Sequence, residues 1–178
     1  DLTASGDALV RYGSDIGPLG RDVARIGAAA LWQRTWVANI GLLTQAQAGL
    51  QGDFYQIGDA VAFDDQITRV TPSLGLTLRY PLIKSTATAR HLLEPLAMVA
   101  WTDTFGGTPP NEDSTRPEFD AANMLALSRV PGNDAVEMGV QGALGLHWRR
   151  EGKAGTTTHL TFGRVIRDIP DPRFTRTS

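Results

Sequence analysis

Histidine and serine are the residue types in this chain that could support hydrolysis or hold a metal ion. His91, His147 and His159 are too few and too scattered to match the spacing of a metal site. Ser73 and Ser85 supply hydroxyl groups, but no segment combines a serine, a histidine and a carboxylate as a catalytic triad requires. The sequence therefore predicts no catalytic residue, no metal site and no cofactor.

A cluster of acidic side chains is the second feature with chemical potential. Glu112, Asp113 and Asp120 supply the carboxylate oxygens that a divalent cation such as calcium prefers. Their spacing does not match an EF-hand loop, and Arg116 and Arg129 are available as partners. We interpret the cluster as a solvated or arginine-paired loop.

The composition excludes several classes of partner. The 178 residues carry a net charge of −2, so there is no basic surface of the kind that binds nucleic acid. Only 20% of the residues are charged, below the average of about 25% in soluble proteins. No apolar run approaches the about 20 residues that a membrane helix requires. The chain has no cysteine and no visible signal peptide, and we expect it to be an internal segment of a longer protein.

Hydrophobic and polar side chains alternate along most of the extended segments. Successive side chains in a strand point to opposite faces, so each segment presents one apolar and one polar face. Clear examples are Leu74, Leu76, Leu78, Tyr80 and Leu82 against Ser73, Gly75, Thr77 and Arg79, and Leu144, Leu146 and Trp148 against Gln141, Gly145 and His147. The polar rows are also rich in Gly, Ala and Gln, which is typical of a sheet between lipid and a polar lumen.

Clusters of Gly, Pro, Asn and Asp divide the chain into six predicted spanning strands. The strands cover residues 22–34, 41–55, 68–82, 87–101, 135–150 and 156–167. They are longer than the about 5–6 residues usual in soluble sheets and long enough for the about 9–11 residues of a membrane-spanning strand. The first twenty residues hold a possible strand end near Ala8–Tyr12 and receive no assignment.

The connections between these strands alternate in length. Residues 56–67 and 102–134 are long connections, whereas residues 83–86 and 151–155 are short. Outer-membrane barrels have long extracellular loops and short periplasmic turns. We therefore predict an all-β fold, an antiparallel transmembrane β-barrel segment with about six long strands of a larger barrel. Residues 1–178 form part of one barrel domain, and residues 102–134 form one long extracellular loop.

Motifs in and around the long loop resemble a known family. The matching segments are His91-Leu92-Leu93-Glu94-Pro95, Asn111-Glu112-Asp113-Ser114, Glu118-Phe119-Asp120, Asn123-Met124-Leu125 and Ser128-Arg129-Val130-Pro131-Gly132-Asn133-Asp134. Over about residues 68–150 the chain is similar to the barrel domain of the LptD family of lipopolysaccharide-assembly outer-membrane proteins. Val130 and Ala135 depart from the family pattern, in which an aromatic and a basic residue are expected.

The resemblance implies a function in lipopolysaccharide export across the cell outer membrane. LptD-like proteins form a barrel of about two dozen strands, plugged by the lipoprotein LptE, and receive lipopolysaccharide from periplasmic bridge proteins through a separate jelly-roll domain. The lipid leaves through a seam between the first and last strands while the sugars pass through the lumen. This chain would supply barrel wall and a surface loop, with the gate and the jelly roll lying outside it.

Two groups of residues are predicted to matter for this function. The first are lumen-facing residues that would offer a hydrated path: Gln45, Gln47, Gln51, Asp53, Arg79, Glu137, Gln141, His147 and His159. The second are loop residues expected to contact the plug: Asn111, Glu112, Asp113, Asp120, Asn123, Arg129, Pro131, Gly132 and Asp134. The histidines His147 and His159 are expected as solvated lumen residues, with a pair across neighbouring strands as the alternative.

Two other functions remain open at this stage. The chain could belong to a different outer-membrane barrel, such as a porin or a surface lipase. It could also form a soluble β-barrel that binds a small apolar ligand, with the apolar rows turned inward. A soluble barrel should carry large polar and charged residues on its outer rows, whereas here the polar rows are rich in Gly, Ala and Gln.

Overall fold

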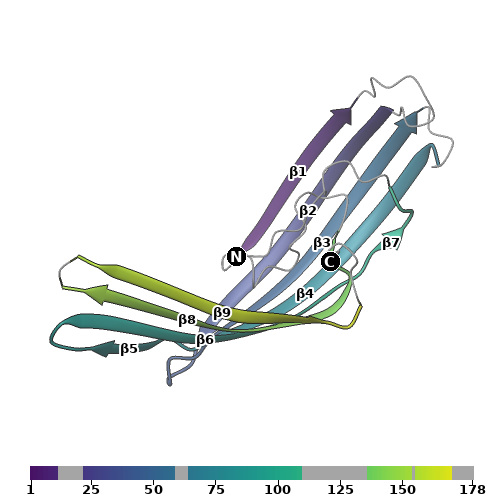
Figure 1. The fold of residues 1–178 in the computed structure, drawn as a ribbon. Coiled ribbons are helices and arrows are strands. Elements are labelled where there is room, and N and C mark those ends of the chain that lie inside the picture. Colours follow the sequence, from purple (N-terminus) through teal and green to yellow (C-terminus); the bar gives the residue numbers. More distant parts are fainter. Residues whose placement is uncertain (12–21, 59–63, 110–135, 154, 170–178) are drawn as a thin grey trace.

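The computed structural model describes residues 1–11, 22–58, 64–109, 136–153 and 155–169, and all regular structure in these ranges is β-strand. Figure 1 shows the strands side by side in one curved sheet. The strands are β1 (Leu2–Arg11), β2 (Asp22–Val37), β3 (Leu43–Gly58), β4 (Gln66–Arg79), β5 (Leu82–Ser85), β6 (Ala89–Thr102), β7 (Phe105–Gly106), β8 (Gly139–Gly152) and β9 (Thr157–Arg167). Among the described residues there is no helix with the length and apolar character needed to cross a membrane.

The sheet is antiparallel throughout and open at both sides. Its order is β1-β2-β3-β4-β6-β8-β9, with β5 paired to β6 and β7 paired to β4. In the described part of the chain β1 and β9 each pair on one side only, so they are the two edges. Neighbours along this path follow one another in the sequence, as expected for an up-and-down meander.

The pairing register sorts the side chains into two faces. Asp53 stands opposite Arg69, and Gln141 stands opposite Arg167, so polar residues meet polar residues on one face. Leu76 stands opposite Val99 on the other face. We call these the polar face and the apolar face. The alternation predicted from the sequence is thus carried across every strand pair in one consistent register.

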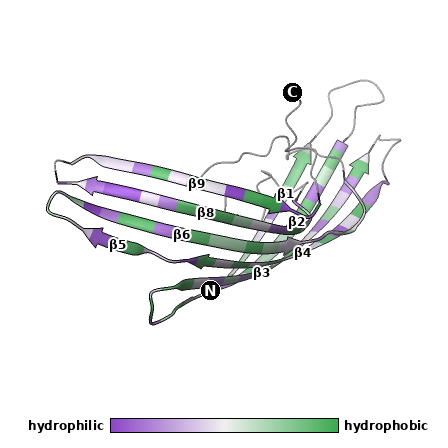
Figure 2. Ribbon diagram, turned by 60° about the horizontal axis from the view of Figure 1, so that its bottom comes forward, coloured by the Kyte–Doolittle hydropathy of each residue, from purple (hydrophilic) through white to green (hydrophobic). Residues whose placement is uncertain are grey.

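In a soluble sheet the apolar side chains are buried, whereas here many large apolar side chains are exposed and several polar ones are buried. Seven of the eight buried apolar residues form two small clusters in the rows of the polar face, Val23, Tyr55, Ile57 and Ile67, and Met98, Ala100 and Ala143; the eighth, Ala89, lies on the apolar face. On the apolar face, Ile26 is 67% exposed, Leu144 60% and Phe162 65%. Figure 2 shows hydrophobic and hydrophilic residues alternating along the strands. A large exposed apolar surface of this kind is rare on soluble monomers and marks a contact surface.

The connections fall into two groups by the end of the sheet at which they lie. Residues 38–42, 86–88 and 153–156 link strands at one end, which we call the short-turn end. Residues 12–21, 59–65 and 103–138 link strands at the opposite end, the long-connection end. The predicted alternation of long and short connections is therefore present in the strand order.

Three strands differ from the prediction. The sequence predicts only a possible strand end near Ala8–Tyr12 where the structure has β1, because the apolar row of this strand is made mainly of Ala4, Gly6 and Ala8 and contrasts weakly with its polar row. The strand predicted over 68–82 ends at Arg79 and resumes as β5 after a break. β7 lies inside the predicted loop 102–134, whose residues 110–134 are outside the described ranges. The sheet accordingly has seven strands along its path and two short additions, rather than six.

The break interrupts the ladder between β4 and β6. Pairing between β4 and β6 runs only from Ser73–Thr102 to Arg79–Leu96. The Tyr80 amide then donates to the Pro95 carbonyl at 3.0 Å, and β5 resumes pairing with β6 at Leu82. Figure 1 shows β6, β8 and β9 running at a wide angle to β1–β4. The interrupted ladder between β4 and β6 therefore lies between two groups of strands that run in different directions.

The short strand β7 depends on a glycine. Gly106 has φ of +114°, and a Cβ at this position would lie 2.1 Å from the Thr68 carbonyl oxygen. The Gly107 amide donates to the same carbonyl at 3.3 Å. Since a non-glycine residue rarely adopts this conformation and has no space here, β7 stays on β4 only with glycine at this position.

We predict that Gly106→Ala separates β7 from β4 in the complete protein, at a local cost of about 1–3 kcal/mol. The measurement is hydrogen–deuterium exchange of the peptide containing residues 105–109, which should become faster. Gly52→Ala is the matched control, because a Cβ there meets nothing within 4 Å. Unchanged exchange in Gly106→Ala would show that β7 does not depend on this contact.

Candidate functional site

A buried ion pair lies on the polar face between β3 and β4. The Arg69 guanidinium Nη2 donates to Asp53 Oδ2 at 2.9 Å and to the Tyr55 hydroxyl at 3.0 Å. Gln51 Nε2 lies 3.1 Å from both carboxylate oxygens of Asp53. The Arg69 side chain also lies over the Tyr55 ring, 5.5 Å from its centre. Asp53 and Arg69 are 2% and 3% exposed, so both charges are removed from solvent and held by several partners.

The ion pair belongs to a row that crosses four strands. Asp7, Gly27, Asp53 and Arg69 stand opposite one another from β1 to β4, and we call them the charged row. Arg25, in the next row of β2, pairs with Asp7. A Cβ at Gly27 would lie 2.9 Å from Asp53 Oδ1 and 3.0 Å from Asp7 Oδ1. The missing side chain at Gly27 therefore lets two carboxylates approach β2 from either side.

A second ion pair joins the segment just before β8 to β9 at the same end of the sheet. Arg167 Nε donates to Glu137 Oε2 at 3.2 Å, and Glu137 is 2% exposed. Gln141, also 2% exposed, stands opposite Arg167. The amide of Val140 donates to the Asp168 carboxylate at 2.8 Å. Charges of opposite sign thus face each other across strands near the long-connection end.

Histidines occupy the polar face nearer the short-turn end. The rings of His147 and His159 stack with centres 6.2 Å apart and planes inclined by 29°. His147 Nδ1 lies 4.0 Å from Glu94 Oε2. In the described ranges no three His, Asp or Glu side chains converge so that they could hold a metal ion. The arrangement corresponds to the cross-strand histidine pair considered from the sequence.

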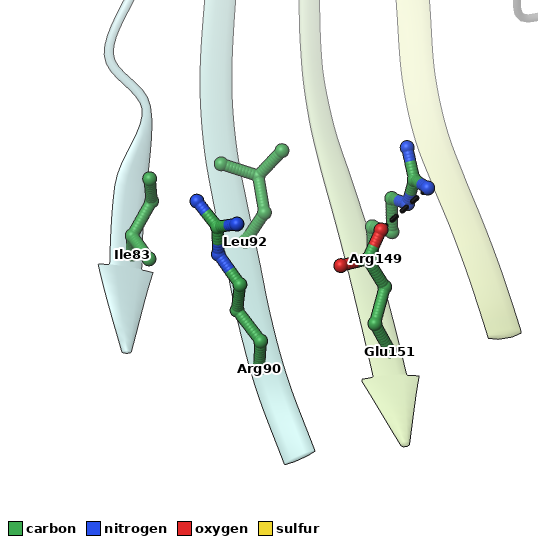
Figure 3. Close-up of a pocket in the computed structure, with 5 residues that line it drawn as sticks. All are labelled: Ile83, Arg90, Leu92, Arg149 and Glu151. Carbon is green, nitrogen blue, oxygen red and sulfur yellow. Dashed lines mark ion pairs between the residues drawn. The ribbon is translucent and has the colours of Figure 1, made fainter. Parts of the chain in front are cut away.

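A small pocket marks the polar face at the short-turn end. Figure 3 shows it lined by Ile83 of β5, Arg90 and Leu92 of β6, and Arg149 and Glu151 of β8. Its volume is about 170 Å³. Arg149 Nη2 pairs with Glu151 Oε1 at 2.5 Å, and both side chains are partly exposed. The pocket is shallow and mixed in polarity, without the enclosed apolar walls of a typical small-molecule site.

The register places all the predicted lumen residues in the rows of the polar face. Those in strands are Gln45, Gln47, Gln51 and Asp53 of β3, Arg79 of β4, Gln141 and His147 of β8, and His159 of β9. Glu137 precedes β8 and reaches the same face through Arg167. The nine predicted plug-contact residues, from Asn111 to Asp134, lie outside the described residues.

The structure adds residues that the sequence did not single out. Asp7, Arg25, Tyr55, Arg69 and Arg167 all belong to the ion pairs or to their immediate contacts. The alternation of β4 could have placed Arg69 on the polar face with Thr77 and Arg79. Its pairing with Asp53 depends on the register between β3 and β4, which no single strand encodes.

An antiparallel sheet with an exposed apolar face and charges buried on the opposite face is the arrangement used for the walls of membrane β-barrels. The model of the LptD family, described as LPS transport system D, matches residues 1–176, and the chain belongs to this family. The resemblance noted in the sequence is thereby confirmed. The family is a transport family of the outer membrane rather than an enzyme family. No curated protein matches the chain.

We predict that Asp53→Asn destabilises the complete protein by about 3–5 kcal/mol, because it leaves the buried Arg69 charge without its carboxylate. The measurement is urea unfolding followed by tryptophan fluorescence. Gln45→Ala on the same strand and face is the control and should cost less than about 1 kcal/mol.

The double variant Asp53→Asn/Arg69→Gln completes the test. It should recover part of the lost stability, because the uncompensated charge is gone. If Asp53→Asn unfolds at the urea concentration of the unchanged protein, the charged row does not hold β3 and β4 together.

Proposed function

We propose that this chain is a wall section of the outer-membrane translocon that inserts lipopolysaccharide into the outer leaflet. The observation that carries the proposal is the sheet itself, with exposed apolar rows on one face and buried polar residues such as Asp53, Arg69 and Gln141 on the other, in a chain of the LptD family. In this proposal the apolar face contacts lipid and the polar face lines the lumen. The location is the cell outer membrane.

The height of the apolar band supports this orientation. On the apolar face of β6 the row from Leu93 to Trp101 spans eight residue steps, about 27 Å at about 3.4 Å per residue. A strand tilt of about 40° reduces this to about 21 Å, close to the about 25 Å apolar band of outer-membrane barrels. Trp101 and Trp148 lie near the two ends of the band, where interfacial aromatic residues are expected.

The polar face has the chemistry of a path for sugars. Its middle rows carry amides, hydroxyls and small residues, which can exchange hydrogen bonds with hydroxylated groups without holding them tightly. The residues proposed to line this path are Gln45, Gln47, Gln51, Asp53, Arg79, Glu137, Gln141, His147 and His159. Their function would be to supply geometry and polarity, with no covalent step.

The long-connection end is proposed to face the cell exterior and the short-turn end the periplasm. Residues 102–134 would fold over or into the lumen and contact an LptE-like plug lipoprotein. Lipopolysaccharide is the transported molecule, and periplasmic bridge proteins would deliver it through a domain separate from this sheet.

The proposal also requires pairing partners for the two edge strands of the sheet. An open strand edge in lipid leaves backbone amides and carbonyls unpaired, at a cost of several kcal/mol per group. Since β1 and β9 are edges here, additional strands must pair with them before the sheet can stand in a bilayer. A soluble barrel with its apolar rows inward is disfavoured by the exposure of Leu144 and Phe162.

The proposal is tested by labelling single cysteines at positions 144–149 of the complete protein in intact outer membranes. Positions 145, 147 and 149 of the polar face should react with a water-soluble thiol reagent, and positions 144, 146 and 148 should be protected by lipid. Reactivity at the even positions with protection at the odd positions would reverse the facing and refute the membrane-wall proposal.

Leu144→Arg provides a second test through assembly. An arginine near the middle of the lipid-facing band costs about 2–4 kcal/mol, so we expect loss of the heat-modifiable folded form on a gel. Leu76→Arg should behave in the same way. Gly145→Arg, one residue away on the polar face, is the matched control and should assemble. Normal mobility of Leu144→Arg would contradict a lipid-facing position.

A further inference from the structure

A row that contains the cationic side chains of Lys84 and Arg150 ends the apolar face at the short-turn end. The register aligns Lys84, His91, Arg150 and Thr158 across β5, β6, β8 and β9, and we call this set the outer cationic row. The adjacent row toward the middle of the sheet is entirely apolar: Leu82, Leu93, Trp148 and Leu160. Along β5 and β8, the apolar face thus changes from apolar to cationic between one residue of this face and the next. The same change occurs in a membrane at the boundary between acyl chains and headgroups.

In the strands that the structure describes, no carboxylate of the neighbouring rows shares the face of Lys84 and Arg150. The nearby carboxylates Glu94 and Glu151 belong to the rows of the polar face, and Glu151 pairs there with Arg149. Among the described residues of the outer cationic row and its apolar neighbour row there is no acidic side chain. His91 stacks on Trp148, with ring centres 5.9 Å apart, which joins the cationic row to the apolar one.

A separate groove lies farther toward the middle of the sheet. It has a volume of about 400 Å³ and lies where β4, β6 and β8 are paired. It is lined by Arg79, Leu96 and Gly145 of the polar face and by Leu78, Ala97 and Leu144, which form one row of the apolar face. This row is six residues along β6 from His91, about 20 Å at about 3.4 Å per residue. Cations at one end and an apolar groove farther along fit a molecule with an anionic head and an acyl chain.

We infer that the outer cationic row and this groove form a binding site for an anionic glycerophospholipid of the periplasmic leaflet. The phosphate group lies against Lys84 and Arg150, and an acyl chain extends toward the groove at Ala97. The site rests on the proposed function, because it requires the apolar face to be in the bilayer. Each lysine or arginine near a membrane surface favours anionic lipid by about fivefold.

The test uses the complete protein in phosphatidylethanolamine vesicles that contain a minor fraction of brominated phosphatidylglycerol or brominated phosphatidylcholine. A bimane fluorophore on Thr158→Cys reports the lipid beside Arg150, because bromine quenches it. Phosphatidylglycerol should quench several-fold more strongly than phosphatidylcholine at equal fractions. Lys84→Gln/Arg150→Gln should remove this difference, and Lys84→Arg/Arg150→Lys should retain it.

A matched control tests whether the lipid preference depends on this site or only on the net charge of the protein. Arg90→Gln/Arg149→Gln removes the same charge from the same end of the sheet, but from the polar face, and should leave the preference unchanged. Equal quenching by the two lipids, or loss of the preference in this control, would overturn the lipid site while leaving the membrane-wall proposal intact. Absence of quenching by either lipid would overturn both, because the label would then not face the bilayer.

Discussion

The register between neighbouring strands determines which side chains lie on the polar face and which lie on the apolar face. Each long strand has side chains for two different surroundings on its two faces, so a slip of one residue would exchange the faces completely. Asp53 would then point to the side on which Phe54 now lies, and the buried charges of the polar face would be presented on the apolar surface. The sheet is therefore specified less by any one strand than by the agreement between neighbours.

The contacts of the charged row favour one alignment of the neighbouring strands over all others. Asp53 and Arg69 stand directly opposite each other, so their contact exists in one register of β3 and β4 only. Gly27 fixes the adjacent strand as well, because only a residue without a side chain leaves space for carboxylates on both sides. A buried ion pair contributes little net stability compared with apolar packing. Its value here is that every wrong register leaves a charge without its partner.

The sequence predicted the parts of the fold that are encoded within single strands. The alternation of Leu74, Leu76 and Leu78 with small polar residues gave the faces, and the assignment of Gln45 or His147 to the polar rows followed from it. The row of β1 was missed because Ala and Gly differ too little from the polar residues between them. The partners of Asp53 and Glu137 were also missed, since they depend on register between strands, which requires three-dimensional information.

The interruption at Pro95 shows how the ladder between β4 and β6 can be broken without leaving an amide of Pro95 unpaired. In an antiparallel strand the amide and carbonyl of one residue point to the same neighbour, and the Pro95 carbonyl accepts from Tyr80 on the β4 side. The missing amide of Pro95 therefore faces the break and not β8, and the β6–β8 pairing remains continuous from Ala89 to Thr102. Pro81, on the opposite side of the break, also lacks an amide hydrogen. Both prolines lie at the interruption of the ladder, and neither has an amide hydrogen that the interruption could leave unpaired.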